Sequence, residues 1–193
     1  GVGIDEIVVV VGYKKESIYK ELDNYDIIFV SNNIFESSNS AYSLWLAKDM
    51  LCGNEFITLN CDLLFHQSYL SYFINNRSSF CCVIDSQREI KSNDSFRAFL
   101  DREDNIIEFK KNLDSDTEVP GPFIFDGPNS IKLFNYLDEN IDDIKNEWAF
   151  SVYNTLAKDI KLKGVKTNMP WVEIDDIDDY NQALQITKED NEK

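Results

Sequence analysis

Apolar runs alternate with polar segments through the first half of the chain. Ile7–Val11 is an unbroken run of β-branched residues, which is typical of a strand buried on both faces of a parallel sheet. Further strands are expected over 26–30, 56–60 and 80–84. Apolar residues at helical spacing predict helices over 15–22, 41–51 and 66–74. This alternation predicts right-handed βαβ units around a parallel sheet.

The second half has a different pattern. Two apolar segments, 96–101 and 106–110, flank the polar residues 102–105 and predict a β-hairpin. The remaining expected elements are strands over 123–125, 160–165 and 171–174, and helices over 130–137, 149–157 and 178–186. We therefore expect one α/β domain over residues 1–193, with a mixed, mostly parallel sheet and a small hairpin appendage. The polar tail 187–193 is expected to fray.

Charge and hydropathy exclude several classes of function. The 193 residues include 35 acidic and 19 basic side chains, for a formal net charge of −16. Non-specific binding to nucleic acid or to an anionic membrane needs clustered Lys and Arg, so neither partner is expected. No apolar run approaches the roughly 20 residues that span a bilayer. A nucleotide ligand remains compatible with this charge, because Mg²⁺ and a few cations can hold a triphosphate.

The cysteines do not indicate a metal site or a nucleophile. Cys52, Cys61, Cys81 and Cys82 contain no C-x-x-C spacing, and His66 is the single histidine. Zinc binding and Cys–His catalysis are therefore disfavoured. The last three cysteines stand in apolar runs and are interpreted as small, buried, reduced thiols of a cytoplasmic protein.

Two aspartates follow predicted strands. FITLNCD ends at Asp62, and WVEIDD contains Asp175. Open α/β sheets bind ligands at the carboxyl ends of their strands, and Mg²⁺ is held by one or two carboxylates plus substrate phosphates. The pair therefore predicts phosphoryl-type chemistry on a nucleotide. Alternatively, Asp62 caps the helix expected near His66, and the acids after Asp175 interact favourably with the positive end of the dipole of the last helix.

The order of four motifs resembles a known family. VVVVGYKKE, SSNSAYSLWLAKDM, FITLNCD and WVEIDDIDDY follow one another as in nucleotidyltransferases of the nucleotide-diphospho-sugar transferase fold. The phosphocholine and 2-aminoethylphosphonate cytidylyltransferases are the most similar members. The resemblance implies a Rossmann-like three-layer αβα fold. It also implies Mg²⁺-dependent transfer of a nucleotide, with CTP favoured, to a small phosphate or phosphonate acceptor, with release of pyrophosphate.

The resemblance also implies roles for individual residues. Asp62 and Asp175 match the metal-binding, catalytic aspartates. The residues expected to bind the nucleotide are Ser38, Asn39, Ser40 and Tyr42. Those expected to face the acceptor are Arg97, Lys110, Lys111, Glu147 and Trp148. A homodimer is compatible with the pattern. Enzymes of this kind make activated head groups for surface polymers or lipids.

One part of the family pattern is missing. The family's first strand, its G-x-G-x-R loop and its P-K motif have no counterpart here, because the sequence begins about where that region ends. We therefore expect the chain to be the C-terminal part of a longer domain and to be inactive alone. The attacking oxygen of a phosphate is already anionic, so no protein nucleophile is needed.

Three alternatives stay open at this stage. A sugar-1-phosphate uridylyl- or thymidylyltransferase would share the fold and differ in base preference. A chain without the phosphate loop could be a non-catalytic regulatory or binding module. A glycosyltransferase of the same fold group would use a D-x-D motif, but Asn60 stands in its first position.

Overall fold

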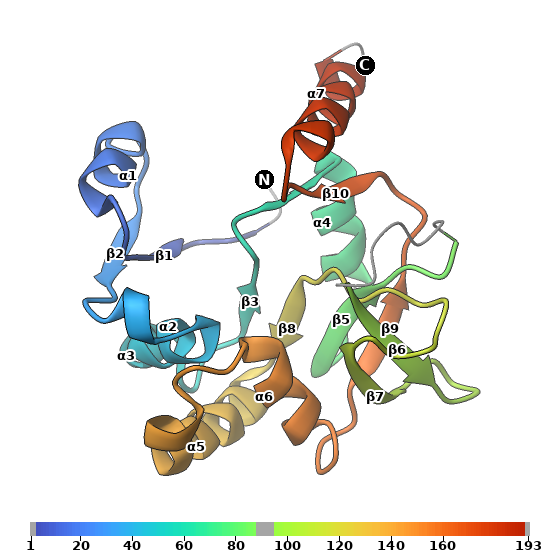
Figure 1. Cartoon of the computed structure of the whole chain (residues 1–193). Helices are drawn as coiled ribbons and strands as arrows, with labels where there is room; N and C mark the ends of the chain where they lie inside the picture. The colour runs from blue at the N-terminus through green and yellow to red at the C-terminus, as the bar shows by residue number, and fades with distance from the viewer. Residues whose placement is uncertain (1–2, 88–94, 192–193) are drawn as a thin grey trace. The chain divides into compact units, whose positions relative to one another are not determined.

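The computed structural model describes residues 3–87 and 95–191 (Figure 1). These residues form two compact units. The first contains 3–56 and 126–156, and the second contains 57–87, 95–125 and 157–191. Among the described residues, no helix has both the length and the apolar character needed to cross a bilayer.

The first unit opens with a βαβ unit. Strands β1 (Val8–Val11) and β2 (Ile28–Ser31) pair in parallel and are joined by helix α1 (Lys15–Glu21), which confirms the predicted topology. The prediction of a strand buried on both faces is wrong. Only Val11 is buried, and Ile7 is 52% exposed. The reason is that β1 and β2 form a sheet of two strands, so few side chains cover them.

Helices form the rest of the first unit. The helix expected over 41–51 is divided at Ala47 into α2 (Ser40–Leu46) and α3 (Lys48–Leu51), and the short 3₁₀ helix η1 (Phe35–Ser37) precedes them. α5 (Gly127–Ile144) is longer than expected because Asp126 accepts a hydrogen bond from the N–H of Asn129 and so caps its start. α2 packs against α5 and against α6 (Ala149–Leu156).

A mixed sheet forms the core of the second unit. Its strand order is β3 (Phe56–Thr58), β8 (Phe123–Phe125), β5 (Phe80–Ile84) and β9 (Lys163–Lys166). β5 is buried along its whole length and runs parallel to β9. The mixed sheet was predicted, but β8 runs antiparallel to β5, so the sheet is less parallel than expected.

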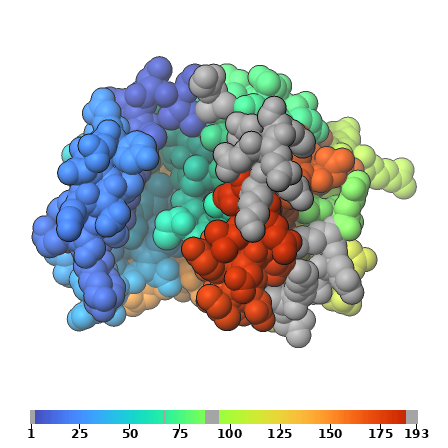
Figure 2. Space-filling view, turned by 90° about the horizontal axis from the view of Figure 1, so that it is seen from above, coloured from blue at the N-terminus to red at the C-terminus, as the bar shows by residue number. Residues whose placement is uncertain are grey.

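A second pair of strands lies at the candidate site. β4 (Leu63–Phe65) pairs antiparallel with β10 (Trp171–Glu173). The sequence analysis did not predict β4. Helix α4 (Gln67–Asn75) follows it, and α7 (Ile177–Asn191) follows β10. α7 lies on the surface (red in Figure 2) and continues through Asn191, so most of the tail expected to fray is helical.

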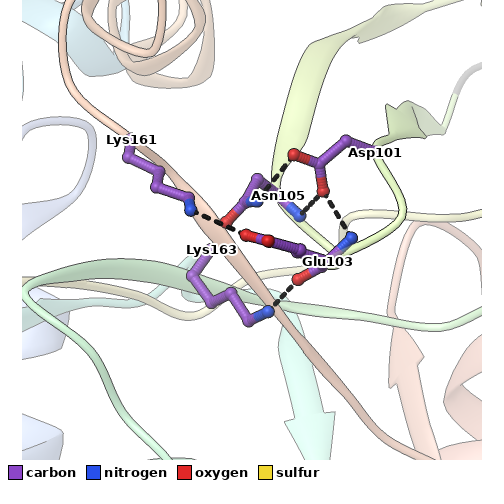
Figure 3. A network of polar contacts seen from close by, with 5 residues as sticks. All are labelled: Asp101, Glu103, Asn105, Lys161 and Lys163. Atoms are coloured by element: carbon purple, nitrogen blue, oxygen red, sulfur yellow. Dashed lines mark hydrogen bonds and ion pairs between the residues drawn. The ribbon is translucent and has the colours of Figure 1, made fainter.

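The predicted hairpin is confirmed and is anchored to β9. It consists of β6 (Phe96–Leu100) and β7 (Ile106–Lys111). In its turn, the Asp101 carboxylate accepts hydrogen bonds from the N–H groups of Glu103 and Asn105 (Figure 3). Lys161 forms an ion pair with Glu103, and Lys163 donates to the Glu103 carbonyl. These contacts fix the turn against the start of β9.

Candidate active site

Strand pairing brings the two predicted acidic segments together. Glu173 of β10 lies opposite Leu63 of β4, and the N–H of Ile174 donates to the Asp62 carbonyl at 2.9 Å. Asp62 therefore lies next to the Glu173–Asp175 segment at the end of the β4–β10 ladder. The sequence predicted that Asp62 and Asp175 would lie near each other, and the pairing of β4 with β10 provides the geometry.

Asp62 is not a helix cap. His66 occupies the N-cap position of α4, and its side chain accepts a hydrogen bond from the N–H of Ser68. One carboxylate oxygen of Asp62, Oδ1, is buried and accepts no hydrogen bond from any described residue. A buried acceptor without a donor is costly. The free energy is recovered if a cation or a ligand donor binds there.

Glu173 is a site residue that the sequence analysis missed. Burial, together with the negative charges of Asp62 and Asp175, raises its pKa to about 7. The positive charge of Lys111 opposes this shift, whereas the charge of Glu118 adds to it. The Glu173 carboxylate therefore feels the charges of several acids and of one lysine. The signal in the sequence was a carboxylate inside an otherwise apolar strand, WVE.

Asp175 and Asp176 have different positions. Oδ1 of Asp176 accepts from the N–H groups of Asp178 and Asp179, so Asp176 caps α7, as expected for acids at a helix start. Asp175 precedes this cap and has an exposed side chain, and its N–H donates to Asp179 Oδ2 at 3.2 Å. The negative charge of Asp175 is among those that raise the pKa of Glu173.

The donor set fits a hard divalent cation that is shared with a substrate. In the part of the chain that the structure describes, no group of three or more His, Cys, Asp or Glu residues is arranged to hold a metal ion. Mg²⁺ does not need such a group, since it keeps several waters and binds through one or two carboxylates plus phosphates. The buried, undonated Oδ1 of Asp62 and the nearby Asp175 match this kind of site.

The loop expected to bind the nucleotide is held by Asn32, a buried residue that the sequence analysis missed. Asn32 stands just after β2, and its Nδ2 donates to Ser38 Oγ at 2.9 Å and to Ser43 Oγ at 3.3 Å. Its Oδ1 accepts from the N–H of Ile34 at 3.0 Å. One amide side chain therefore sets the path of the loop that carries Ser38.

The start of α2 lies against the loop between α5 and α6. The Asn39 side chain caps α2, and Ser40 Oγ accepts from the N–H of Ala149. The N–H of Asn39 donates to the carbonyl of Lys145, and the N–H of Ala41 donates to that of Glu147. Glu147 and Trp148, expected to face the acceptor, therefore lie beside residues expected to bind the nucleotide. Tyr42 packs against Trp45, with ring centroids 5.4 Å apart.

The three candidate cations of the hairpin differ in their surroundings. Lys110 is exposed, lies opposite Arg97 and forms an ion pair with Glu108 at 2.7 Å. Lys111 lies over the ring of Phe96, 5.8 Å from its centroid, and its charge acts on Glu173. Arg97 Nη1 is 3.5 Å from the carbonyl oxygen of Leu113. Lys111 is thus the hairpin cation whose charge acts at the acidic site.

The cysteines are as predicted with one exception. All four are free thiols, and Cys81 and Cys82 are buried in β5. Burial raises the pKa of the Cys82 thiol well above its usual value, so it stays protonated. Cys61 is exposed, and its prediction as a buried thiol is wrong. The strand expected over 56–60 ends at Thr58, which leaves Cys61 in the turn before β4.

Comparison with known proteins identifies relatives. A choline-phosphate cytidylyltransferase of Streptococcus pneumoniae is 25% identical over 196 residues, which cover 98% of this chain and 81% of the relative. A CTP:phosphoglutamine cytidylyltransferase of Campylobacter jejuni is 25% identical over 208 residues, which cover 95% of this chain and 82% of the relative. No protein-family model matches the chain.

The fold is shared with solved nucleotidyltransferases. The structure of a CTP:phosphocholine cytidylyltransferase from Streptococcus pneumoniae superposes with a TM-score of 0.77 and 18% identity, covering 96% of this chain and 79% of that one. The nucleotide-diphospho-sugar transferase fold that the sequence predicted is thereby confirmed. The relatives also support the prediction of a nucleotidyltransferase, with CTP as the favoured nucleotide. Enzymes of this type generally use a divalent metal ion.

Proposed function

We propose that this relative of bacterial cytidylyltransferases transfers the cytidylyl group of CTP to a small phosphate or phosphonate acceptor and releases pyrophosphate. The observation that carries the proposal is the meeting of Asp62 with the Glu173–Asp175 segment at the end of the β4–β10 ladder. We further propose that both compact units belong to one nucleotidyltransferase domain.

The carboxylates would act through a bound divalent cation, Mg²⁺ in our proposal. Asp62 and Asp175 would hold the ion, which would supply positive charge at the phosphates. The acceptor oxygen attacks the α-phosphorus in line, a bond to that phosphorus forms, and the bond to the departing pyrophosphate breaks. The attacking oxygen carries its own negative charge, so the chain needs to supply position and charge and no general base.

The other candidate residues would position the two substrates. The loop of Ser38, Asn39, Ser40 and Tyr42 would contact the base and ribose, and Asn32 would fix its shape. Lys111, the hairpin cation whose charge acts on Glu173, would attract the acceptor's phosphate. The backbone of Glu147 is bonded to the start of α2, so Glu147 and Trp148 would lie beside the nucleotide-binding loop.

Pyrophosphate release tests the proposal. The full natural protein is incubated with Mg²⁺, each of CTP, UTP, dTTP, ATP and GTP, and a panel of phosphorylated acceptors. We expect release with CTP and one acceptor class, and a loss of at least 100-fold in the variants Asp62→Asn and Asp175→Asn. Asp178→Asn is the matched control, because Asp178 is an exposed acid in the first turn of α7.

The other outcomes separate the alternatives. Release with UTP or dTTP and a sugar 1-phosphate would replace the cytidylyltransferase by a sugar-1-phosphate nucleotidyltransferase. If no pair of substrates releases pyrophosphate, the transferase proposal fails, and a non-catalytic binding module of the same fold takes its place.

A further inference from the structure

A buried hydrogen bond joins the end of β5 to the start of β10. Asp85 directly follows β5 and is 5% exposed, and its Oδ2 accepts a 2.9 Å hydrogen bond from Nε1 of Trp171. Its Oδ1 accepts another bond of 2.9 Å from the N–H of Gln87. Hydrogen bonds to an ionised acceptor are roughly twice as strong as those between neutral groups. The carboxylate therefore binds the indole of Trp171 more firmly than a neutral acceptor would.

The backbone of Asp85 has a fixed position. Its N–H donates to the Glu118 carbonyl at 3.0 Å, and its own carbonyl accepts from the N–H of Glu118 at 2.8 Å. The strand that leads to it, β5, is buried along its whole length and pairs with β9. Side chains on paired strands are positioned more precisely than those on loops. Asp85 is therefore a rigid point to which Trp171 is attached.

Packing alone does not fix the orientation of the Trp171 ring. The ring belongs to an apolar cluster with Tyr69, Phe73 and Val83. Trp171 and Asp85 also line a cavity of about 560 Å³. A cavity supplies no atoms for the ring to pack against, whereas close-packed neighbours restrict a side chain on every side. The directional bond to Asp85 is what holds the indole in one orientation beside this open volume.

The orientation of Trp171 affects the acidic segment that follows it. Trp171 is the first of the three residues of β10, and Glu173 is the last. β10 pairs with β4 in a sheet of two strands, which is separate from the four-stranded sheet that contains β5. The bond from Trp171 to Asp85 thus connects the small sheet to the large one. Asp175 lies four residues beyond Trp171, at most about 13 Å away, so a tilt at the start of β10 would displace it.

We infer that Asp85 is a positioning residue for the proposed cytidylyl transfer. Through Trp171 it fixes the orientation of β10 and hence the position of Asp175 relative to Asp62. The inference rests on the proposed function. Without this bond β10 would still pair with β4, but Asp175 would be less well placed to share a metal ion with Asp62. Catalytic geometry is sensitive to displacements of about 1 Å, even when their cause lies far from the reacting atoms.

Magnesium binding to the full natural protein tests the inference without turnover. We expect Asp85→Ala and Trp171→Phe each to raise the Kd for Mg²⁺ by about tenfold in a calorimetric titration with MgCl₂. The double variant should bind Mg²⁺ no more weakly than the weaker single variant, because both changes remove the same hydrogen bond. Trp171→Phe keeps an aromatic ring in the apolar cluster, so it tests the bond even if Asp85→Ala does not fold.

A second pair of the same kind supplies the matched control. In the first unit, Asp138 accepts a 2.9 Å hydrogen bond from Nε1 of Trp45. Asp138→Ala removes this bond and should leave the Kd for Mg²⁺ unchanged. Fluorine NMR of protein labelled with 5-fluorotryptophan observes the three tryptophans separately. Asp85→Ala should shift or broaden the signal of Trp171, which is identified by its loss in Trp171→Phe, whereas Asp138→Ala should change only that of Trp45.

Steady-state kinetics then relates the bond to the reaction. We expect kcat of Trp171→Phe to fall at least tenfold, while the KM for CTP changes by less than about threefold, because the nucleotide loop belongs to the other unit. Wild-type affinity for Mg²⁺ in Trp171→Phe, or additive effects in the double variant, would overturn the inference. Absence of turnover by the wild type with every substrate pair would overturn the proposed function. The Kd values for Mg²⁺ would still decide whether Asp85 positions the metal site.

Discussion

The backbone carbonyl of Asp62 accepts a 2.9 Å hydrogen bond from the N–H of Ile174. This bond continues the ladder in which Leu63 pairs with Glu173. The two acidic segments are therefore held together by strand pairing and not by attraction between side chains, which repel one another. A bound cation would offset this repulsion.

Magnesium should stabilise the fold through Asp62. We expect the Tm to rise by about 5–10 °C at a Mg²⁺ concentration about 100 times the Kd, since a ligand that binds the folded state adds about 2.7 kcal/mol there. Scanning calorimetry measures this shift without any activity assay. Asp62→Asn should abolish the shift, whereas Asp178→Asn should keep it. An equal shift in Asp62→Asn and wild type would place the metal elsewhere.

The pH dependence of stability should report on Glu173. Its pKa is about 7 in the folded chain, above the ordinary 4.5, so the folded state binds more protons than the unfolded state between these values. Glu173 therefore favours folding most below about pH 4.5, and this contribution is lost as the pH rises through about 7. In Glu173→Gln the decline of Tm over this range should be smaller. An unchanged decline would show that Glu173 does not titrate there.

The two neighbouring lysines of β7 should differ in effect. Lys111→Met should raise the KM for the phosphorylated acceptor by about tenfold, because a charge-assisted contact is lost. It should also raise the pKa of Glu173 beyond about 7, since Lys111 opposes that shift. Lys110→Met is the control: Lys110 forms an exposed ion pair with Glu108, a kind of contact that contributes little. The reverse order of effects would contradict the assignment.

Asn32 should affect nucleotide affinity indirectly, because it holds the loop that carries Ser38. Asn32→Ala removes the contacts to Ser38, Ser43 and Ile34 and should cost about 1–3 kcal/mol of stability. We expect the KM for CTP to rise while the KM for the acceptor changes little, which steady-state kinetics resolves. Asn24→Ala, at an exposed position, is the control. If both KM values rise together, Asn32 serves the fold in general.

Local sequence patterns predicted the parts of the fold that depend on short-range signals. The strand β5 and the hairpin follow from apolar runs and the residues that end them, whereas the strand expected over 56–60 ends at Thr58, so Asp62 precedes β4 instead of following a strand end. β4 was missed because Leu63–Phe65 is too short a run to be recognised without its partner β10. The start of α5 was missed because Gly127-Pro128 is typical of a turn, whereas the Asp126 cap makes it a first helical turn.

The candidate site residues that were not predicted from the sequence were missed for one physical reason. Asn32 and Glu173 are defined by neighbours that are distant in sequence and by burial, and a single sequence does not reveal either feature. The resemblance to a family gave Asp62 and Asp175 as the expected metal ligands and assigned no role to Asn32 or Glu173.

Phosphorus NMR of the reaction mixture is the decisive test of cytidylyl transfer. The full natural protein is mixed with CTP, Mg²⁺ and an acceptor panel, and the products are observed without coupling enzymes. We expect equal amounts of pyrophosphate and of a new phosphoric anhydride that joins CMP to the acceptor, both absent with Asp62→Asn. Hydrolysis of CTP without the anhydride, or no reaction with any acceptor, would contradict this expectation.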